Sequence, residues 1–380
     1  MSTIRPLAGL TVIEIGHSIA APYAGMILGE LGAEVIKVEN PKGGDAARGW
    51  GPPFAEGAAT CFHAVNRSKR GIAIDLADPR AVEKLRGLIL ERADVVIHNL
   101  KYGALDRYGL SGADLLAQKP GLVYCNLGAF GAVGPLRERP GYDPLMQAYG
   151  GLMSMLGEDG RPPVRISVSI IDLATGMWAV IGVLAALAER GKTGRGGIVD
   201  TSLYETALAW MTIPLAAYAV NGQLPARVGS GVEMIVPYQA FAARDGHIMV
   251  AAGNDNLFRR LCGALGHQGL AEDPRFLTNR DRVVNRAVLV PTLAKIFVTE
   301  PIAAWTKRLD AAGIPNGPIQ NVEQVVADAQ TEALGILQNW PGSPLALVGL
   351  PLSFDGARPP LVKLAPALGE DNPAILGDPE

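Results

Sequence analysis

One carboxylate in this chain lies among apolar side chains, a setting in which carboxylates often act as catalytic groups. Asp172 lies in the segment Ser167–Trp178, among mostly small and apolar side chains, at the point where a helix is expected to begin. An unpaired carboxylate in apolar surroundings costs free energy, so it is kept either to cap the helix or to act chemically. From the spacing alone helix capping is the better explanation, and the same holds for Asp143, which also precedes a helical pattern.

Other polar candidates follow strand-like segments. His17, Asn40 and Asn99 each come directly after such a segment, and so does the glycine loop at 128–134. Ligands bind beyond the carboxyl ends of parallel strands, so these positions are candidate binding residues. His17 is equally compatible with a structural role. The glycine loop does not match G-x-G-x-x-G, which makes a dinucleotide site a weak hypothesis and a flexible turn the better one.

Two groups of basic residues are candidates for binding anions. The run NRSKR at 66–70 is typical of a solvated face. Lys101 and Arg107 are more suggestive, because they follow Asn99 just beyond a predicted strand end. Cations in that position are well placed to meet the phosphates of a ligand.

The elements that must position these residues alternate along the first half of the chain. Helical patterns begin at Pro22 and near Asp78, and strands are predicted at 10–15, 34–39, 71–75, 94–98 and 122–126. Such alternation predicts βαβ units and a mostly parallel sheet. Residues 170–220 are expected to be largely helical, and strands at 238–243 and 247–252 indicate a smaller α+β region.

These patterns predict an α/β fold with two domains. A Rossmann-like large domain with a mostly parallel sheet is expected at 1–220, completed by a returning C-terminal segment at 330–380. A small α+β domain is expected at 229–315, with linkers at 221–228 and 316–329. A chain of 380 residues, 48% of them hydrophobic, is long enough to bury a core in each.

Composition and charge exclude several classes of function. The formal net charge is −3 with acidic and basic residues interspersed, which gives no electrostatic basis for binding nucleic acid or an anionic membrane surface. Cys61, Cys125 and Cys262 form no CxxC pair, so we expect no disulfide framework, no metal site and a cytoplasmic location. Apolar stretches at 178–187 and 206–220 are shorter than the ~20 residues of a membrane span, and no signal peptide is predicted.

The order of several short motifs is more specific than any one of them. The motifs are LTVIE at 10–14, LGAEVIKVE at 31–39, NRSKR at 66–70, GYD at 141–143, ID at 171–172 and KTGRG at 192–196. Together they cover nearly the whole chain. In this order they resemble the class III CoA-transferases, the CaiB/BaiF family, which includes formyl-CoA, carnitine and dicarboxylate CoA-transferases.

The resemblance implies an enzyme that uses a CoA thioester and a small carboxylic or dicarboxylic acid as substrates, with no permanently bound cofactor. Asp172 would be the nucleophile that attacks the thioester and forms a mixed anhydride, from which water must be excluded. The implied fold is an interlocked homodimer in which each chain is threaded through the other. CoA and acyl contacts would come from His17, Ile19, Ala20, Asn40, Ile74, Ala77, Asn99, Leu100, Lys101, Arg107, Tyr142 and Asp143.

The resemblance also bears on the substrates. Ile19 stands where the formyl type has a glutamine, which argues against oxalate or formate. The segment at 249–255 is closer to the dicarboxylate type, and succinyl-CoA is a natural donor. Arg48 and Arg165 are candidates for pairing with the distal carboxylate of an acceptor. The identity of the acceptor acid is not specified by the sequence.

Two alternatives to a transferase stay open. The α-methylacyl-CoA racemases have the same fold and need an acid/base group on each side of the α-carbon. In that branch a histidine stands at the position of Tyr142, and tyrosine is a poor base near neutral pH, which favours the transferase. The second alternative is a CoA-binding protein without catalysis, which the presence of Asp172 and the glycines around it disfavours.

Overall fold

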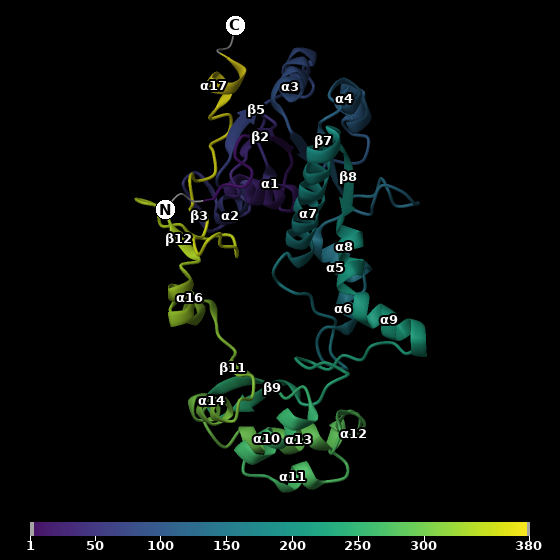
Figure 1. Cartoon of the computed structure of the whole chain (residues 1–380), viewed down its shortest axis with the longest axis vertical. Coiled ribbons are helices and arrows are strands. Elements are labelled where there is room, and N and C mark those ends of the chain that lie inside the picture. Colours follow the sequence, from purple (N-terminus) through teal and green to yellow (C-terminus); the bar gives the residue numbers. More distant parts are fainter. Residues whose placement is uncertain (1–3, 378–380) are drawn as a thin grey trace. The chain divides into compact units, whose positions relative to one another are not determined.

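The computed structural model describes residues 4–377, and a six-stranded parallel sheet forms the centre of the larger of its two units (Figure 1). The order across the sheet is β5-β2-β1-β6-β7-β8, and every neighbouring pair is parallel. The predicted α/β class is therefore confirmed. The strands are β1 (Thr11–Ile15), β2 (Glu34–Glu39), β5 (Arg70–Ala73), β6 (Val95–His98), β7 (Val123–Gly128) and β8 (Gly197–Ser202).

The strand order reverses between β1 and β6, so the carboxyl ends of these strands border a topological switch point. From β1 the chain proceeds outward to β2 and β5, and it then returns to β6 on the other side of β1. The connections leave these two strands in opposite directions and open a crevice where ligands bind. His17 follows β1 and Asn99 follows β6, so both predicted residues lie at this crevice.

Helices cover both faces of the sheet. On one face α1 (Ala20–Glu30) and α7 (Ile170–Thr193) pack against each other, and they contact β1, β2, β7 and β8. On the other face α3 (Pro79–Arg92) and α4 (Gly112–Gln118) enclose a second layer of core. That layer is fully buried and contains Leu85 and Leu115 from the helices with Ile13, Ile36 and Val96 from the strands.

The C-terminal segment packs against the edge strand β5. The carboxylate of Asp371 accepts a hydrogen bond from Gly71 N at 2.8 Å, and Asn372 Oδ1 accepts one from Ala73 N at 2.8 Å. The short helix α17 (Asn372–Leu376) then contacts the core of the sheet. Two amide groups of β5 that have no neighbouring strand are thereby satisfied, which blunts an edge open to unwanted pairing.

Contacts group the chain into two compact units. The first contains the residues up to Gly151, then Ile166–Thr212, and the residues from Ala329 onward. Its shorter elements are η1 (Ala46–Gly49), β3 (Phe54–Ala55), β4 (Ala58–Ala59), α2 (Thr60–Asn66), η2 (Asp106–Tyr108), α5 (Asp143–Tyr149), α8 (Leu203–Trp210), α16 (Ala329–Leu334), β12 (Leu337–Asn339) and β13 (Ala346–Val348).

The second unit comprises Leu152–Arg165 and Ile213–Asp328 and has a core of its own. Its antiparallel sheet has the order β11-β10-β9, and in its core Phe297 stacks on Phe241 with ring centroids 4.7 Å apart. The elements are α6 (Leu152–Met155), α9 (Thr212–Asn221, entered from the first unit), β9 (Tyr238–Ala243), β10 (Gly246–Ala251), α10 (Asp255–Ala264), α11 (Gly269–Glu272), α12 (Asn279–Val284), α13 (Arg286–Phe297), α14 (Ile302–Ala311), β11 (Asn316–Pro318) and α15 (Val322–Val326).

Most predicted strands agree with the structure to within two residues, but β8 lies in a stretch that was expected to be helical. Gly194, with φ of 71°, ends α7 in the left-handed conformation and lets the chain turn back. Residues 197–202 then pair with β7 in parallel. This strand is half polar and sits at an edge, so it lacks the continuous apolar run that predicts a buried strand.

Helix α7 is longer and more apolar than the stretch at 178–187 suggests. Its 24 residues suffice in length and composition to cross a membrane, and α13 with α14 passes the same test only if that bent pair is one span. Core helices of globular proteins pass this test as well, and 39% of the apolar window of α7 is buried inside the chain. Met177, Trp178 and Ile181 on α7 are about half exposed.

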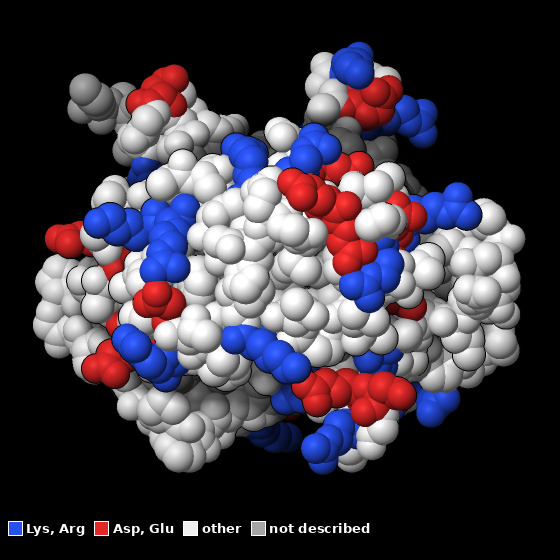
Figure 2. Space-filling view, turned by 90° about the horizontal axis from the view of Figure 1, so that it is seen from below, with Lys and Arg blue, Asp and Glu red and all other residues white. Residues whose placement is uncertain are grey.

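Charged side chains are dispersed over the face that Figure 2 shows. On the face in Figure 2, Lys and Arg side chains are interspersed with Asp and Glu, and broad uncharged areas separate them. This agrees with the formal net charge of −3. That face therefore presents no extended field of one sign that would attract a polyanion.

Candidate active site

Helix α7 begins with a carboxylate from another element of the chain. Asp143 Oδ2 accepts hydrogen bonds from the backbone amides of Ile171 at 2.7 Å and of Asp172 at 3.3 Å. Ser169, the N-cap residue of α7, makes no side-chain capping bond. The amides that a first turn leaves unpaired are thus satisfied by Asp143. The capping role that spacing alone favours for Asp172 is therefore wrong, and Asp143 caps α7 rather than its own helix α5.

Asp143 is itself held in place by Gln147, one turn further along α5. Gln147 Nε2 donates to Asp143 Oδ1 at 2.6 Å, and the same side chain bonds both the N–H and the carbonyl of Ile166. Asp143 is 1% exposed and Gln147 is fully buried. Every polar atom of this small network has a partner, so it fixes the start of α7 rigidly.

The carboxylate of Asp172 is free for chemistry. It lies in the first turn of α7, and it forms no hydrogen bond or ion pair with any of residues 4–377. Burial, and then the negative charge of Asp143, raise the pKa of Asp172 to about 7. A carboxylate with this pKa is more basic than usual and yet substantially ionised near neutral pH, which suits a nucleophile.

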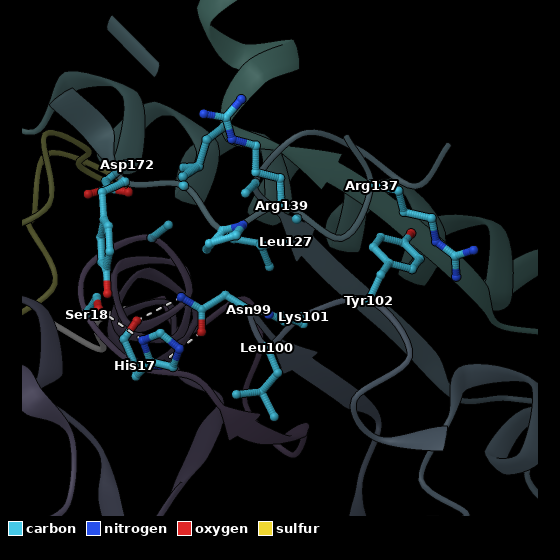
Figure 3. Close-up of a pocket in the computed structure, with 17 residues that line it drawn as sticks. His17, Ser18, Asn99, Leu100, Lys101, Tyr102, Leu127, Arg137, Arg139 and Asp172 are labelled. Carbon is cyan, nitrogen blue, oxygen red and sulfur yellow. Dashed lines mark hydrogen bonds between the residues drawn. The ribbon is translucent and has the colours of Figure 1, made fainter. Parts of the chain in front are cut away.

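Asp172 faces a cavity of about 260 Å³ in the first unit (Figure 3). The predicted residues that this cavity brings together with it are His17, Ala20, Asn99, Leu100, Lys101 and Tyr142. The lining also includes Ser18, Tyr102, the stretch Leu127–Ala129, Arg137, Arg139, Pro140, Gly141 and Leu203. Small, apolar and cationic groups therefore surround a single carboxylate.

A glycine brings α7 close to α1 beside this cavity. A Cβ atom at Gly176 would lie 2.7 Å from the carbonyl oxygen of Ala20, a separation that real Cβ atoms do not show. Any side chain at this position would push the two helices apart. Gly176 lies one turn after Asp172, so its size sets how near the carboxylate comes to the start of α1.

The turn after β1 is fastened on two sides. His17 N donates to Asn99 Oδ1 at 3.0 Å, and Asn99 Nδ2 donates to the carbonyl of His17 at 2.8 Å, as Figure 3 shows. Ser18 has a φ of 67°, which is uncommon for a residue with a side chain, and its amide donates to Asp45 Oδ1 at 3.0 Å. The His17 ring nitrogen Nδ1 lies 2.9 Å from Ser18 Oγ. The turn is therefore preorganised at the switch point.

A buried ion network contacts that turn through Asp45. Lys37 Nζ lies 3.0 Å from Asp45 Oδ2 and 3.1 Å from Glu14 Oε1, and it donates to the carbonyl of Gly16 at 2.8 Å. Burial alone would lower the pKa of Lys37, but Glu14 and Asp45 outweigh it and raise that pKa. Lys69 Nζ completes the pairing of Glu14 at 2.6 Å. The network links the interior of the sheet to the residue that holds Ser18.

A second cavity of about 490 Å³ also borders the His17 turn. Of the predicted residues, Asn40, Ile74 and Ala77 line it, and His17 and Leu100 line both cavities. Three predicted residues line neither cavity: Ile19 is buried, Asp143 caps α7, and Arg107 stacks at 4.7 Å on Tyr108, which lines the second cavity. Most residues expected to contact one extended ligand therefore line one or other of two cavities that meet at His17 and Leu100.

Arginines are found in the cavity, but not those that the sequence suggested. Arg48 is bound to Glu39 through two hydrogen bonds of 2.8 and 2.6 Å, and Arg165 lies in the second unit and lines neither cavity. Arg137 and Arg139 line the cavity of Asp172 instead. The sequence could have indicated these two arginines, because they come directly after the glycine loop that follows β7. No cluster of three or more His, Cys, Asp or Glu suited to a metal ion occurs within residues 4–377.

Known proteins resemble this chain over its whole length. A protein from Brucella suis described as a CAIB/BAIF family protein has a solved structure with a TM-score of 0.87, 40% identity, and coverage of 98% of this chain and 99% of that one. A succinate–glutarate CoA-transferase from Agrobacterium fabrum is 36% identical over 389 residues, 99% of this chain and 96% of the relative. An acetyl-CoA:oxalate CoA-transferase from Acetobacter aceti is 35% identical over 97% of this chain and 95% of the relative.

Residues 7–372 match the model of the sequence family described as CoA-transferase family III. The match spans both units, and the family resemblance drawn from the short motifs is confirmed. This chain therefore belongs to CoA-transferase family III and is a CoA-transferase.

Proposed function

We propose that this protein transfers CoA from an acyl-CoA donor, such as succinyl-CoA, to a small dicarboxylic acid through an acyl anhydride on Asp172. The observation that carries the proposal is the Asp172 carboxylate, unpaired and facing a cavity with several cations. The names of the relatives support a dicarboxylic acceptor, because glutarate and oxalate both have two carboxylates. The oxalate name also means that Ile19 alone is a weak argument against oxalate.

The two cavities suit one CoA molecule. The nucleotide would occupy the larger cavity beside Asn40, Ile74 and Ala77, and the pantetheine arm would pass His17 and Leu100, which line both cavities. The thioester would then reach the cavity of Asp172. This order follows from the shared lining and from the place of ligands at a switch point.

The chemistry requires three bond exchanges, all of which balance without an added reactant. Asp172 attacks the thioester carbonyl, the C–S bond breaks, and CoA thiolate leaves while the donor acyl group forms an anhydride with Asp172. The acceptor carboxylate attacks the aspartyl carbon and releases the donor acid. The thiolate then attacks the acceptor carbonyl of the new anhydride, which gives the product thioester and returns Asp172 as a carboxylate. Water must be kept out, because it would hydrolyse either anhydride.

The nucleophile assignment is tested by the Asp172→Asn variant with glutarate as acceptor and succinyl-CoA as donor. We expect the variant to fold, with a circular dichroism spectrum like that of the wild type, and to lose transfer by at least about 10³-fold. Hydroxylamine added during turnover should convert Asp172 of the wild type to its hydroxamate, detected by peptide mass spectrometry. Transfer by the variant at a rate near that of the wild type would overturn the assignment.

A racemase makes a different prediction from the same residues. It would exchange the α-proton of a 2-methylacyl-CoA with solvent deuterium without any acceptor acid. Our proposal predicts no such exchange above the background rate, and transfer that depends on the acceptor. Rapid deuterium incorporation in the absence of an acceptor would favour the racemase.

We also propose that the chain forms a homodimer. Trp178 and Ile181 on α7 and Trp210 on α8 are each about half exposed. Large apolar side chains grouped on neighbouring helices indicate a covered surface. Light scattering should give about twice the mass of one chain, and a monomer at micromolar concentration would contradict the proposal.

A further inference from the structure

The cavity of Asp172 carries an excess of positive charge that the nucleophile does not balance. Lys101, Arg137 and Arg139 line it, and Asp172 is the single carboxylate in the lining. None of the three cations forms an ion pair with another residue between 4 and 377. Cations left unpaired around a cavity are available to an anionic ligand.

The two arginines are held by aromatic rings. The Arg137 guanidinium lies 5.0 Å from the centre of the Tyr102 ring, and that of Arg139 lies 5.7 Å from the centre of the Phe130 ring. The Tyr102 hydroxyl in turn donates to Asp200. Packing on a ring engages the face of a guanidinium and leaves its N–H edge free, so it can form two parallel hydrogen bonds with one carboxylate.

The three cations differ in their place along the cavity. Lys101 adjoins Leu100, which lines both cavities, so it is suited to the CoA arm. In the view of Figure 3, Arg137 lies beside Tyr102 at the far end from Asp172, and Arg139 lies between them. Arg139 is also followed in the lining by the stretch 140–142, and the next residue, Asp143, is bonded to the backbone of Asp172. Arg139 is therefore the cation best placed to meet a group a few carbon atoms from the carbonyl that reacts with Asp172.

We propose that Arg139 binds the non-reacting carboxylate of the dicarboxylic substrate, with Arg137 supporting it for longer acids. The inference rests on the proposed function and names the subsite that would make it selective for dicarboxylic over monocarboxylic acids. An aliphatic diacid of four or five carbons has one carboxylate for Asp172 and a second that needs a cation once water is removed. Rejection of a monocarboxylic acid follows, because it leaves the arginine N–H groups unpaired.

The test compares Arg139→Gln with Arg195→Gln, an exposed arginine beyond α7 that lines neither cavity. Acceptor selectivity is the ratio of kcat/KM for glutarate to kcat/KM for valerate, which has the same chain length and one carboxylate. Loss of one charged pair should lower this ratio by about 10- to 100-fold in Arg139→Gln. Arg139→Lys keeps the positive charge but cannot form two parallel hydrogen bonds with one carboxylate. Its selectivity ratio should therefore lie between those of Arg139→Gln and the wild type. The ratio of Arg195→Gln should equal that of the wild type.

Binding of CoA alone separates this role from a contact with the CoA phosphates. Calorimetric titration of free CoA should give the same Kd for wild type and Arg139→Gln. An unchanged selectivity ratio in Arg139→Gln, or weaker CoA binding with equal losses for both acids, would overturn the subsite while leaving the proposed function in place. A wild type that transfers CoA to no dicarboxylic acid would overturn both.

Discussion

Asp143 accepts a hydrogen bond from the backbone of Asp172 at 3.3 Å, so one carboxylate caps the helix that presents the other. This relationship separates two roles that a single aspartate would have to combine. A capping carboxylate is engaged with amides, whereas the Asp172 side chain stays unpaired and faces the cavity. The negative charge of Asp143 also adds to burial in raising the pKa of Asp172.

The Asp143→Asn variant should shift the pH profile of catalysis. Its amide oxygen can still accept from the helix start, but it carries no charge, so the pKa of Asp172 should fall below about 7. Acylation needs the ionised carboxylate, so the rising limb of kcat/KM for the acyl-CoA should move to lower pH. The variant should also lose about 1–2 kcal/mol of stability, because its amide group would face the donor of Gln147.

A matched control for this variant is Asp159→Asn, which removes an exposed carboxylate outside both cavities. Its pH profile should overlay that of the wild type. A rising limb at the same pH in Asp143→Asn and the wild type would show that Asp143 does not tune the nucleophile.

The raised pKa of Asp172 predicts a stability that depends on pH. The pKa is about 7 in the folded chain and near 3.8 in the unfolded chain, so the folded state binds the extra proton between these values. Its stability therefore falls as pH rises from about 4 to 7 and stays lowered above 7. Asp172→Asn removes this penalty and should gain on the order of 1–3 kcal/mol at pH 8 and little at pH 4. Urea unfolding at the two pH values measures the difference, and an equal effect at both would contradict the pKa.

Lys37 should be among the most sensitive positions in the fold. Lys37→Met leaves the buried carboxylates of Asp45 and Glu14 without their shared cation and should cost about 3–5 kcal/mol. Lys42→Met removes an exposed ion pair of 3.6 Å with Asp75 and should cost less than about 1 kcal/mol. Equal denaturant midpoints for the two variants would contradict the larger cost predicted for removing Lys37.

Local sequence signals predicted the sheet better than the site. The strand at 34–39 has its predicted bounds because Val35, Ile36 and Val38 favour a strand and the turn residues Gly32 and Pro41 stand on either side of it. His17 and Asn99 were identified because the ends of parallel strands meet at one edge. Strand β8 was missed because it lies at the other edge and is half polar.

The missed parts of the site depend on contacts between distant residues. Asp143 caps a helix through the amide of Ile171, 28 residues later in the sequence, and no local pattern shows such a pairing. Arg137 and Arg139 lie on an irregular loop whose path depends on Gly131 and Gly134, both with positive φ. Tertiary packing decides which side chains of such a loop face a cavity.

The transfer of oxygen to Asp172 tests the anhydride most directly. The enzyme is incubated with unlabelled succinyl-CoA and with glutarate that carries oxygen-18 in both carboxylates. The mass of the peptide that contains Asp172 is then measured by mass spectrometry. When the thiolate takes the glutaryl group, the labelled bridging oxygen stays on the aspartate. We predict that this peptide gains oxygen-18 only when both substrates are present. Formation of glutaryl-CoA with an unlabelled Asp172 peptide would contradict the mechanism.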